Sequence, residues 1–295
     1  MRVIITGGSG LLGQYLNDRL SRNNEILSLY NENEGNCRHY NSIKADIRDW
    51  GRMSMLFNNF RPDAVIHTAC FSRPEICASL SRDVVYRLNV EATEMIAQLS
   101  NDFNSRLIYT STDLVYDGEK DGMLREDADL NPLTLYAESK LMGELIIQNY
   151  SNNYVILRTA LLIGFGRTHT RNNFHHTYEN LRGGNEVKLF KDQFRTPLSL
   201  YEASEFINSL ISLDIRNEII NFGGSEKVSR LEIGKAVCDV CGFNSNLVKE
   251  ISCREVGGVP QVPDVSMNTD KLRALGLSQK SLRENVHHIC EKGIL

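Results

Sequence analysis

The fold of this chain is decided by the stretch Val3-Ile4-Ile5-Thr6-Gly7-Gly8-Ser9-Gly10-Leu11-Leu12-Gly13. An apolar β-type run leads into glycines spaced G-x-x-G-x-x-G, and an amphipathic helical pattern follows over 11–20. Glycines in such a turn let the backbone approach a pyrophosphate, and the helix N-terminus offers free N–H groups to its charge. We therefore expect a dinucleotide to lie against this turn, contacted by Gly7, Gly10, Leu11, Leu12 and Gly13.

The same alternation of strand and helix continues along the chain. Further strand-like runs occur at 26–30, 43–46, 64–69, 107–110, 155–158 and 218–222, and helical patterns occur at 53–59, 84–99 and 136–150. Short runs that are apolar throughout, with helices between them, are typical of a parallel sheet covered on both faces. The predicted fold class is therefore α/β, with a doubly wound, Rossmann-type parallel sheet.

The pattern changes after Ile163. Residues 164–176 are rich in Gly, Arg, Asn and His, and only a helix at 200–213 and the strand at 218–222 return to the sheet. We expect a dinucleotide-binding domain of residues 1–164 plus about 195–224. A smaller, mainly C-terminal substrate-binding domain would comprise about 165–194 plus 225–295, with a cleft between the two.

Composition excludes several classes of protein. The 295 residues include 33 Lys and Arg against 37 Asp and Glu, a formal net charge of −4, which argues against a nucleic-acid-coating surface. No apolar stretch approaches the ~18 residues of a membrane span, and no secretory pattern follows Met1. We expect a cytoplasmic protein that binds neither nucleic acid nor membrane.

Cysteine and histidine give no sign of a metal site. Seven cysteines is an odd number without disulfide-scaffold spacing, so reduced thiols are expected. Cys238 and Cys241 form a C-x-x-C on an amphipathic helical pattern, which favours buried helix cysteines over metal or redox chemistry. The adjacent pairs at 175–176 and 287–288 would point to different sides of a helix.

The choice between NADPH and NADH depends on the end of the second strand, which reads Leu29-Tyr30-Asn31. The acid that usually binds the adenosine ribose is absent, so Asn31 would stand there and nothing repels a 2′-phosphate. Glu32 or Glu34 could still supply an acid, and Arg38 is the nearest downstream cation. The sequence favours NADPH, with NADH as the alternative.

The segment 46–49 (Asp-Ile-Arg-Asp) has two interpretations. Asp46 and Ile47 could contact adenine, or the segment could form a turn and helix cap.

A second motif carries the chemistry. Tyr136 and Lys140 stand at i and i+4 of a predicted helix, which places a phenol beside an ammonium. Ser111, Thr112 and Asp113 follow a strand at the edge where such folds bind ligands. Carbonyl reduction needs a proton donor and a hydrogen-bond partner at the oxygen. Tyr136 would be the acid, Lys140 would lower its pKa and hold the nicotinamide ribose, and Thr112, or else Ser111, would contact the substrate oxygen.

With these motifs the chain resembles the extended short-chain dehydrogenase/reductases, and within them the dTDP-4-dehydrorhamnose reductases. The matching segments lie in the family's order over nearly the whole chain: 6–13, 111–118, 136–144 (YAESKLMGE), 157–159, 172–174, 191–197 and 263–272. The resemblance implies NAD(P)H-dependent reduction of the 4-keto group of a 4-keto-6-deoxy nucleotide-sugar, in deoxysugar formation for surface polysaccharide.

The resemblance also assigns residues to roles. It makes Thr112, Tyr136 and Lys140 the catalytic trio. It places Ala69, Asn89 and Thr159 along the cofactor, and Ser111, Asp113, Asn173, Phe174 and Arg195 at the nucleotide-sugar. A helix cap at 172–173 and a simple loop cation at Arg195 are the structural alternatives.

Some substrate-facing positions depart from the family. An aromatic usually follows the Leu-Arg-Thr run, where this chain has Ala160-Leu161-Leu162, and Val262 replaces a common Arg. The basic insertion 166–171 could offer Arg167 or Arg171 to a diphosphate. These departures bear on the identity of the sugar more than on the reductase chemistry.

Three alternatives stay in view. Dehydration is disfavoured because Leu114, and not a Glu, follows Asp113. A 4-epimerase would share the same trio, and a regulatory subunit without catalysis could keep the same fold. The family often pairs subunits through helices beside the sheet, so a homodimer is possible.

Overall fold

The computed structural model describes residues 1–119 and 122–293. Its main layer is a seven-stranded, wholly parallel sheet in the order β11-β6-β5-β4-β1-β2-β3. The strands are β1 (Arg2–Thr6), β2 (Glu25–Tyr30), β3 (Ser42–Lys44), β4 (Ala64–His67), β5 (Arg106–Thr110), β6 (Tyr154–Thr159) and β11 (Glu218–Phe222). The chain reverses its direction of travel across the sheet between β1 and β4, and ligands bind beside such a reversal in open α/β sheets.

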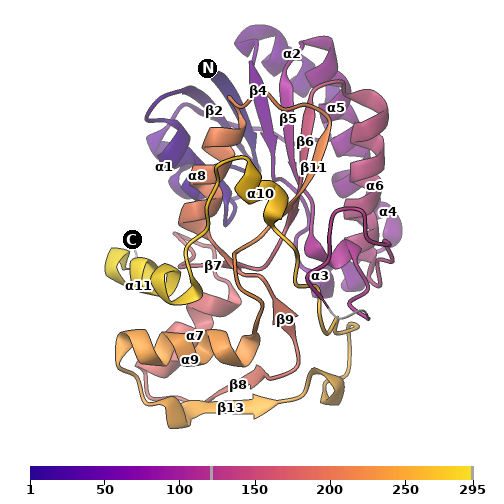
Figure 1. Cartoon of the computed structure of the whole chain (residues 1–295). Helices are drawn as coiled ribbons and strands as arrows, with labels where there is room; N and C mark the ends of the chain where they lie inside the picture. Colours follow the sequence, from indigo (N-terminus) through magenta and orange to yellow (C-terminus); the bar gives the residue numbers. More distant parts are fainter. Residues whose placement is uncertain (120–121, 294–295) are drawn as a thin grey trace.

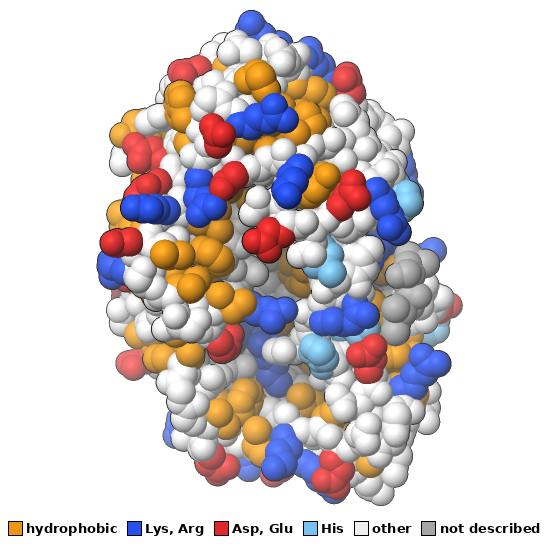
Figure 2. Space-filling view, turned by 180° about the vertical axis from the view of Figure 1, so that it is seen from behind, with side chains coloured by type: hydrophobic (Ala, Val, Ile, Leu, Met, Phe, Trp, Pro, Cys, Tyr) orange, Lys and Arg blue, Asp and Glu red, His pale blue; other side chains and the backbone are white. Residues whose placement is uncertain are grey.

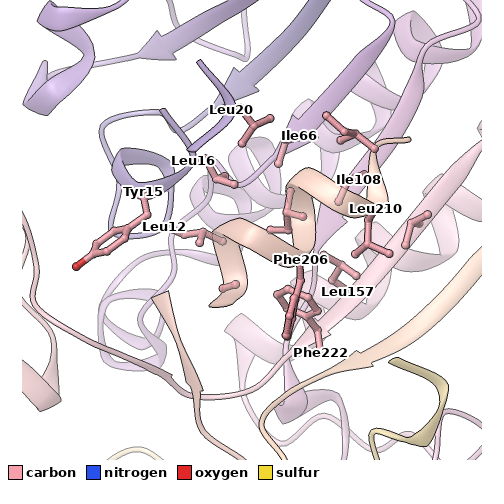
Figure 3. Packing of buried hydrophobic residues seen from close by; sticks show 14 of the residues in the cluster. Leu12, Tyr15, Leu16, Leu20, Ile66, Ile108, Leu157, Phe206, Leu210 and Phe222 are labelled. Atoms are coloured by element: carbon pink, nitrogen blue, oxygen red, sulfur yellow. The ribbon is translucent and has the colours of Figure 1, made fainter. Parts of the chain in front are cut away.

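Helices cover both faces of this sheet (Figure 1). One face carries α1 (Gly13–Leu20) and α8 (Leu200–Leu210), and the other carries α2 (Trp50–Phe60), α5 (Ala92–Asp102) and α6 (Leu135–Tyr150). Successive residues of β1 alternate between the faces, because Val3 and Ile5 pack with α1 while Ile4 packs with α2. Figure 3 shows Leu16 and Leu20 of α1, with Leu12 just before that helix, packed toward Phe206 and Leu210 of α8. The predicted doubly wound sheet is confirmed.

A smaller group of elements lies below the sheet in Figure 1. It contains α7 (Asn173–Arg182), β8 (Val187–Phe190), β9 (Phe194–Arg195), β12 (Val228–Ser229), α9 (Arg230–Cys241), β13 (Val248–Ile251) and α11 (Leu282–Lys292). These elements enclose a separate apolar cluster that includes Phe165, Phe174 and Val237. The paired strands are parallel for β8–β13 and antiparallel for β9–β12. The remaining short strands and α-helices are β7 (Leu162–Ile163), β10 (Leu198–Ser199), α3 (Pro74–Ser79), α4 (Arg82–Tyr86) and α10 (Asp270–Ala274).

Several boundaries differ from the sequence pattern for local reasons. The helix expected at 53–59 begins at Trp50, because the Asp49 carboxylate accepts the Arg52 N–H and caps it. The helix expected at 84–99 is divided into α4 and α5 by a π-helical turn over Arg87–Glu91. Strand β4 ends at His67, two residues early, where the backbone turns toward the cleft described below.

The C-x-x-C motif lies at the end of α9. Cys238 is buried, as predicted, but Cys241 is only half-buried and its Sγ lies 3.0 Å from Sγ of Cys290 on α11. Both are thiols, and among residues 1–119 and 122–293 no three His, Cys, Asp or Glu side chains are grouped to hold a metal ion. None of the helices in those two ranges combines the length and apolar character needed to cross a bilayer.

Candidate active site

A cleft of about 1580 Å³ runs along the carboxyl ends of the sheet strands and continues between the sheet and the smaller group of elements. Figure 2 shows this face hollowed between its upper and lower parts, with Lys, Arg and His side chains around the hollow. Most of the sequence-predicted site residues line it: Gly7, Gly10, Leu11, Leu12, Asn31, Asp46, Ile47, Ala69, Ser111, Thr112, Asp113, Tyr136, Thr159, Asn173, Phe174 and Arg195. The lining of the cleft does not include Gly13, Asn89 or Lys140.

The glycine turn is shaped so that backbone faces the cleft. Gly7 has φ +70°, and the Gly10 N–H donates to the Gly7 carbonyl at 2.9 Å. At Gly13 a Cβ would lie 2.1 Å from the Gly7 oxygen and 2.7 Å from the Gly8 Cα. Gly13 therefore lets α1 pack closely against the turn, although it does not itself reach the cleft. This close packing is what a pyrophosphate cradle at a helix N-terminus requires.

The far end of the cleft is formed by the loops after β2 and β3. The Asp46 carboxylate accepts the Arg48 N–H at 2.9 Å and binds the Arg48 guanidinium through both oxygens, which lowers the pKa of Asp46. Helix α2 is capped by Asp49, so Asp46 is not the cap and keeps its place on the cleft wall. Asn89 lies inside the protein and not on the cleft wall. Its side-chain amide accepts the Phe71 N–H and donates to the Phe71 carbonyl and the Ser139 hydroxyl.

Two residues of the predicted trio, Thr112 and Tyr136, line the cleft, whereas Lys140 is buried outside its lining. Thr112 follows β5, while Tyr136 and Lys140 stand on successive turns of α6, which begins where the Thr134 hydroxyl caps Ala137. Burial raises the pKa of Tyr136, while the Lys140 charge and a hydrogen bond with Thr112 lower it. The Lys140 side chain is buried, and its Nζ lies 4.1 Å from the centroid of the Tyr109 ring.

A buried polar network adjoins these residues. The Ser111 hydroxyl donates to Glu144, whose carboxylate also binds the Arg158 guanidinium with an Nη2–Oε2 distance of 3.0 Å. Arg158 further donates to the Tyr116 hydroxyl at 2.9 Å. The Ser111 hydroxyl is therefore engaged with the interior, whereas the Thr112 hydroxyl bonds its own neighbours, donating to Asp113 Oδ1 at 3.2 Å and accepting the Leu114 N–H at 3.2 Å.

Next to Thr112, three charged residues meet at the wall of the cleft: Asp113, Arg195 and Arg230. Asp113 Oδ2 lies 3.7 Å from Arg195 Nε and has no hydrogen-bond partner in the part of the chain that the structure describes. Arg195 also donates three hydrogen bonds to backbone carbonyls, two from Nη1 to Phe194 and Pro263 and one from Nη2 to Val262. Burial raises the pKa of Asp113, an effect that Arg195 reduces.

Arg230, at the start of α9, also lines this wall. Its Nε donates to Gln193 at 3.1 Å, and within residues 1–119 and 122–293 no carboxylate lies in ion-pair range of its guanidinium. Burial and neighbouring Arg195 lower the pKa of Arg230 to about 9. The sequence pattern alone offered no signal for Arg230, because only the β9–β12 pairing brings residue 230 beside residue 195.

The prediction that Arg167 could serve a diphosphate is wrong. Its guanidinium pairs with Asp18, stacks 4.0 Å over the Tyr15 ring and is buried against α1. Arg171 does line the cleft, as do Val262 and the Ala160-Leu161-Leu162 run that depart from the family pattern. Asn172 caps α7 by accepting the His175 N–H, which leaves Asn173 and Phe174 on the cleft wall.

Comparison with known proteins agrees with the fold and the order of these motifs. The model of the RmlD substrate binding domain family matches residues 1–294, so the chain belongs to that family of extended short-chain dehydrogenase/reductase-like proteins. The crystal structure of dTDP-4-dehydrorhamnose reductase from Bacillus anthracis, in complex with NADP, superposes with a TM-score of 0.86 at 23% identity over 99% of each chain.

Curated relatives have two kinds of names. The chain is 26% identical to methionine adenosyltransferase 2 subunit beta of Xenopus laevis over 287 residues, which covers 95% of this chain and 84% of that protein. It is 27% identical to a "probable low-salt glycan biosynthesis reductase" of Haloferax volcanii over 254 residues, 84% of this chain and 83% of the other. A reductase and a subunit of another enzyme therefore share this fold.

Proposed function

We propose that this chain is an NAD(P)H-dependent reductase of the 4-keto group of a 4-keto-6-deoxy nucleotide-sugar. The observation that carries the proposal is that the Tyr136 phenol and Thr112 both line the cleft, with Lys140 one helical turn further along α6. Bound cofactor would supply a hydride to the carbonyl carbon. Tyr136 would donate the proton to the carbonyl oxygen, and Thr112 would hold that oxygen in place.

The residues of the cleft fit a dinucleotide. A Cβ at Gly13 would collide with the turn, so the cradle is shaped for backbone approach to a pyrophosphate. Gly7, Gly10, Leu11 and Leu12 would contact the pyrophosphate, and Lys140 would bind the nicotinamide ribose. Asp46 and Ile47 would face adenine, Asn31 the adenosine ribose, and Ala69 and Thr159 the nicotinamide side. We favour NADPH, because Asn31 carries no charge to repel a 2′-phosphate.

The nucleotide-sugar would occupy the remaining half of the cleft. Its sugar would lie between Thr112 and the wall formed by Asn173 and Phe174, and its diphosphate would lie toward Arg195 and Arg230. Arg230 suits an anion because it faces the cleft without a recorded carboxylate partner among the described residues. We place the reaction in deoxysugar formation for surface polysaccharide, in a cytoplasmic protein that could act as a homodimer.

A regulatory subunit is the second candidate. It is favoured by the relatives named as methionine adenosyltransferase 2 subunit beta, which align over 95% of the chain. The complete Thr112, Tyr136 and Lys140 trio favours the reductase, since a protein used only for contact has no need of it. A 4-epimerase would use the same trio but consume no cofactor overall.

The test follows absorbance of the reduced nicotinamide at about 340 nm. Enzymatically made dTDP-4-keto-6-deoxysugar is supplied with NADPH or NADH to the wild type and to Tyr136→Phe, and cofactor binding is measured separately on both. We expect turnover with the wild type and a loss of about 100-fold or more in Tyr136→Phe, the size of a general acid's contribution. Cofactor binding without turnover in the wild type would overturn the proposal.

A further inference from the structure

The ammonium of Lys140 has an unusual partner. Only 2% of this residue is exposed, and its Nζ lies 4.1 Å from the centroid of the Tyr109 ring. Across residues 1–119 and 122–293, the structure records neither an ion pair nor a hydrogen bond from this Nζ. A buried ammonium is normally paired with a carboxylate, so the aromatic face stands where a counter-ion is expected.

Tyr109 is itself held firmly in place. It lies on β5 with 1% of its surface exposed, and its hydroxyl donates to the Lys140 backbone carbonyl at 3.4 Å. Gly143 makes room for that hydroxyl, since a Cβ there would lie 2.3 Å from the phenol oxygen. The ring is thus fixed against the same helix that carries Lys140.

A neutral histidine is a further neighbour of the Tyr109 ring. The His67 ring lies 5.6 Å from the Tyr109 ring, between hydroxyls of Thr6 (2.7 Å) and Thr93 (3.0 Å). Burial and the Lys140 charge lower the pKa of His67 to about 3. Because Thr93 donates its proton to the Asn89 carbonyl, it accepts from His67 Nε2, and Nδ1 accepts from Thr6. His67 therefore adds no positive charge beside the ammonium.

We propose that Tyr109 is a positioning residue for the reaction: its ring face holds the Lys140 ammonium where it serves Tyr136 and the nicotinamide ribose. This inference rests on the proposed reductase function. A carboxylate partner would fix Lys140 equally well but would cancel its charge, whereas an aromatic face attracts the cation and leaves its field on Tyr136 intact. The Lys140 field matters because it lowers the pKa of Tyr136 against the opposing effects of burial, Cys70 and Asp113.

The test compares Tyr109→Leu with Tyr109→Phe, which keeps the ring and loses only the hydroxyl. In Tyr109→Leu we expect NADPH to bind about tenfold more weakly, from loss of a desolvated cation–π contact, while Tyr109→Phe stays within about threefold of the wild type. The alkaline limb of the kcat profile should move to higher pH in Tyr109→Leu only. In that variant Lys140 is no longer held where its charge lowers the pKa of Tyr136. A purely structural defect would lower activity equally at every pH.

A buried leucine could prevent folding, so a second series preserves the volume of the ring. Phenylalanine, 4-fluorophenylalanine and 3,4,5-trifluorophenylalanine are placed at 109, each fluorine weakening the attraction of the ring for a cation. We expect NADPH affinity to fall along this series in the native Lys140 protein and to stay constant in a Lys140→Met background.

The outcomes separate this inference from the reductase proposal. Flat NADPH affinity across the fluorinated series, or an unmoved alkaline limb in folded Tyr109→Leu, would overturn the role of Tyr109. A wild type that binds NADPH but reduces no 4-keto sugar would defeat the proposed reaction. In that case the graded affinity of the series would still establish the contact between Tyr109 and Lys140.

Discussion

The Asp113 carboxylate and the Arg195 guanidinium face each other at 3.7 Å on the wall of the cleft, and both residues are at least 95% buried. Arg195 is occupied by this carboxylate and by three backbone carbonyls. The guanidinium of neighbouring Arg230 lines the cleft and, within residues 1–119 and 122–293, donates one hydrogen bond, from Nε to Gln193. The excess positive charge at this wall therefore lies on Arg230.

Arg230→Gln should weaken binding of the nucleotide-sugar and leave the cofactor unaffected. Losing a charge-assisted contact to the diphosphate should raise KM about 10- to 100-fold, with Arg230→Lys intermediate. Titration calorimetry with dTDP and with thymidine is the matched measurement, because only dTDP carries the diphosphate. If both ligands lose affinity equally, the anion does not bind at Arg230.

Arg158 and Glu144 form an ion pair whose side chains are only 3% and 1% exposed. Removing one partner leaves a buried charge alone, so Arg158→Leu should lower the free energy of unfolding by about 3–5 kcal/mol. The double variant Glu144→Leu/Arg158→Leu should recover part of that loss, because no charge is then stranded. Urea unfolding of the wild type, Arg158→Leu and the double variant measures this, and a double variant no more stable than Arg158→Leu contradicts it.

His67 should make stability depend on pH below neutrality. Folding lowers the pKa of His67 from its ordinary 6.5 to about 3. Between these two pH values the imidazole is protonated in the unfolded chain but neutral in the folded protein. The contribution of neutral His67 to the free energy of unfolding is fully present above pH 6.5. It falls by about 1.4 kcal/mol per pH unit as the pH drops toward 3. The comparison is urea unfolding of the wild type and His67→Gln at pH 7.5, 6 and 5. Parallel decline of the two proteins would show that His67 is not the group responsible.

Gly13→Ala should abolish dinucleotide binding. The new Cβ would meet the Gly7 oxygen and Gly8 at distances no packed structure allows, so the turn must open. Gly257→Ala is the matched control, because a Cβ there has no heavy atom within 4 Å and the residue has no left-handed φ. Fluorescence titration with NADPH should show binding lost in the first variant and retained in the second; retention in both would contradict a pyrophosphate site at this turn.

The predictions that the structure supports came from short sequence motifs. The glycine turn, the β1 run and the i, i+4 spacing of Tyr136 and Lys140 are properties of neighbouring residues. Thr112 follows the strand β5, and the end of such a strand reaches the same sheet edge in any parallel sheet. These features predicted both the sheet and the meeting of the trio at its edge.

The sequence did not predict those features of the site that depend on contacts between segments far apart in the chain. Asp18 lies 149 positions before Arg167, yet their ion pair removes Arg167 from the cleft. Arg230 reaches the cleft through the β9–β12 pairing, and Tyr109 meets Lys140 because β5 lies under α6. In the sequence of β5 alone, nothing distinguishes Tyr109 from an aromatic residue that only fills the core.

The central claim is tested most directly by following the hydride. Wild-type protein is given [4,4-²H₂]NADPH, labelled at both C4 positions, and dTDP-4-keto-6-deoxysugar, and the sugar product is analysed by mass spectrometry and NMR. A reductase that works through Tyr136 and Thr112 should give one deuterium at C4 of the sugar for each NADPH consumed. A sugar without deuterium and an unchanged pool of NADPH would contradict the account and favour an epimerase or a regulatory subunit.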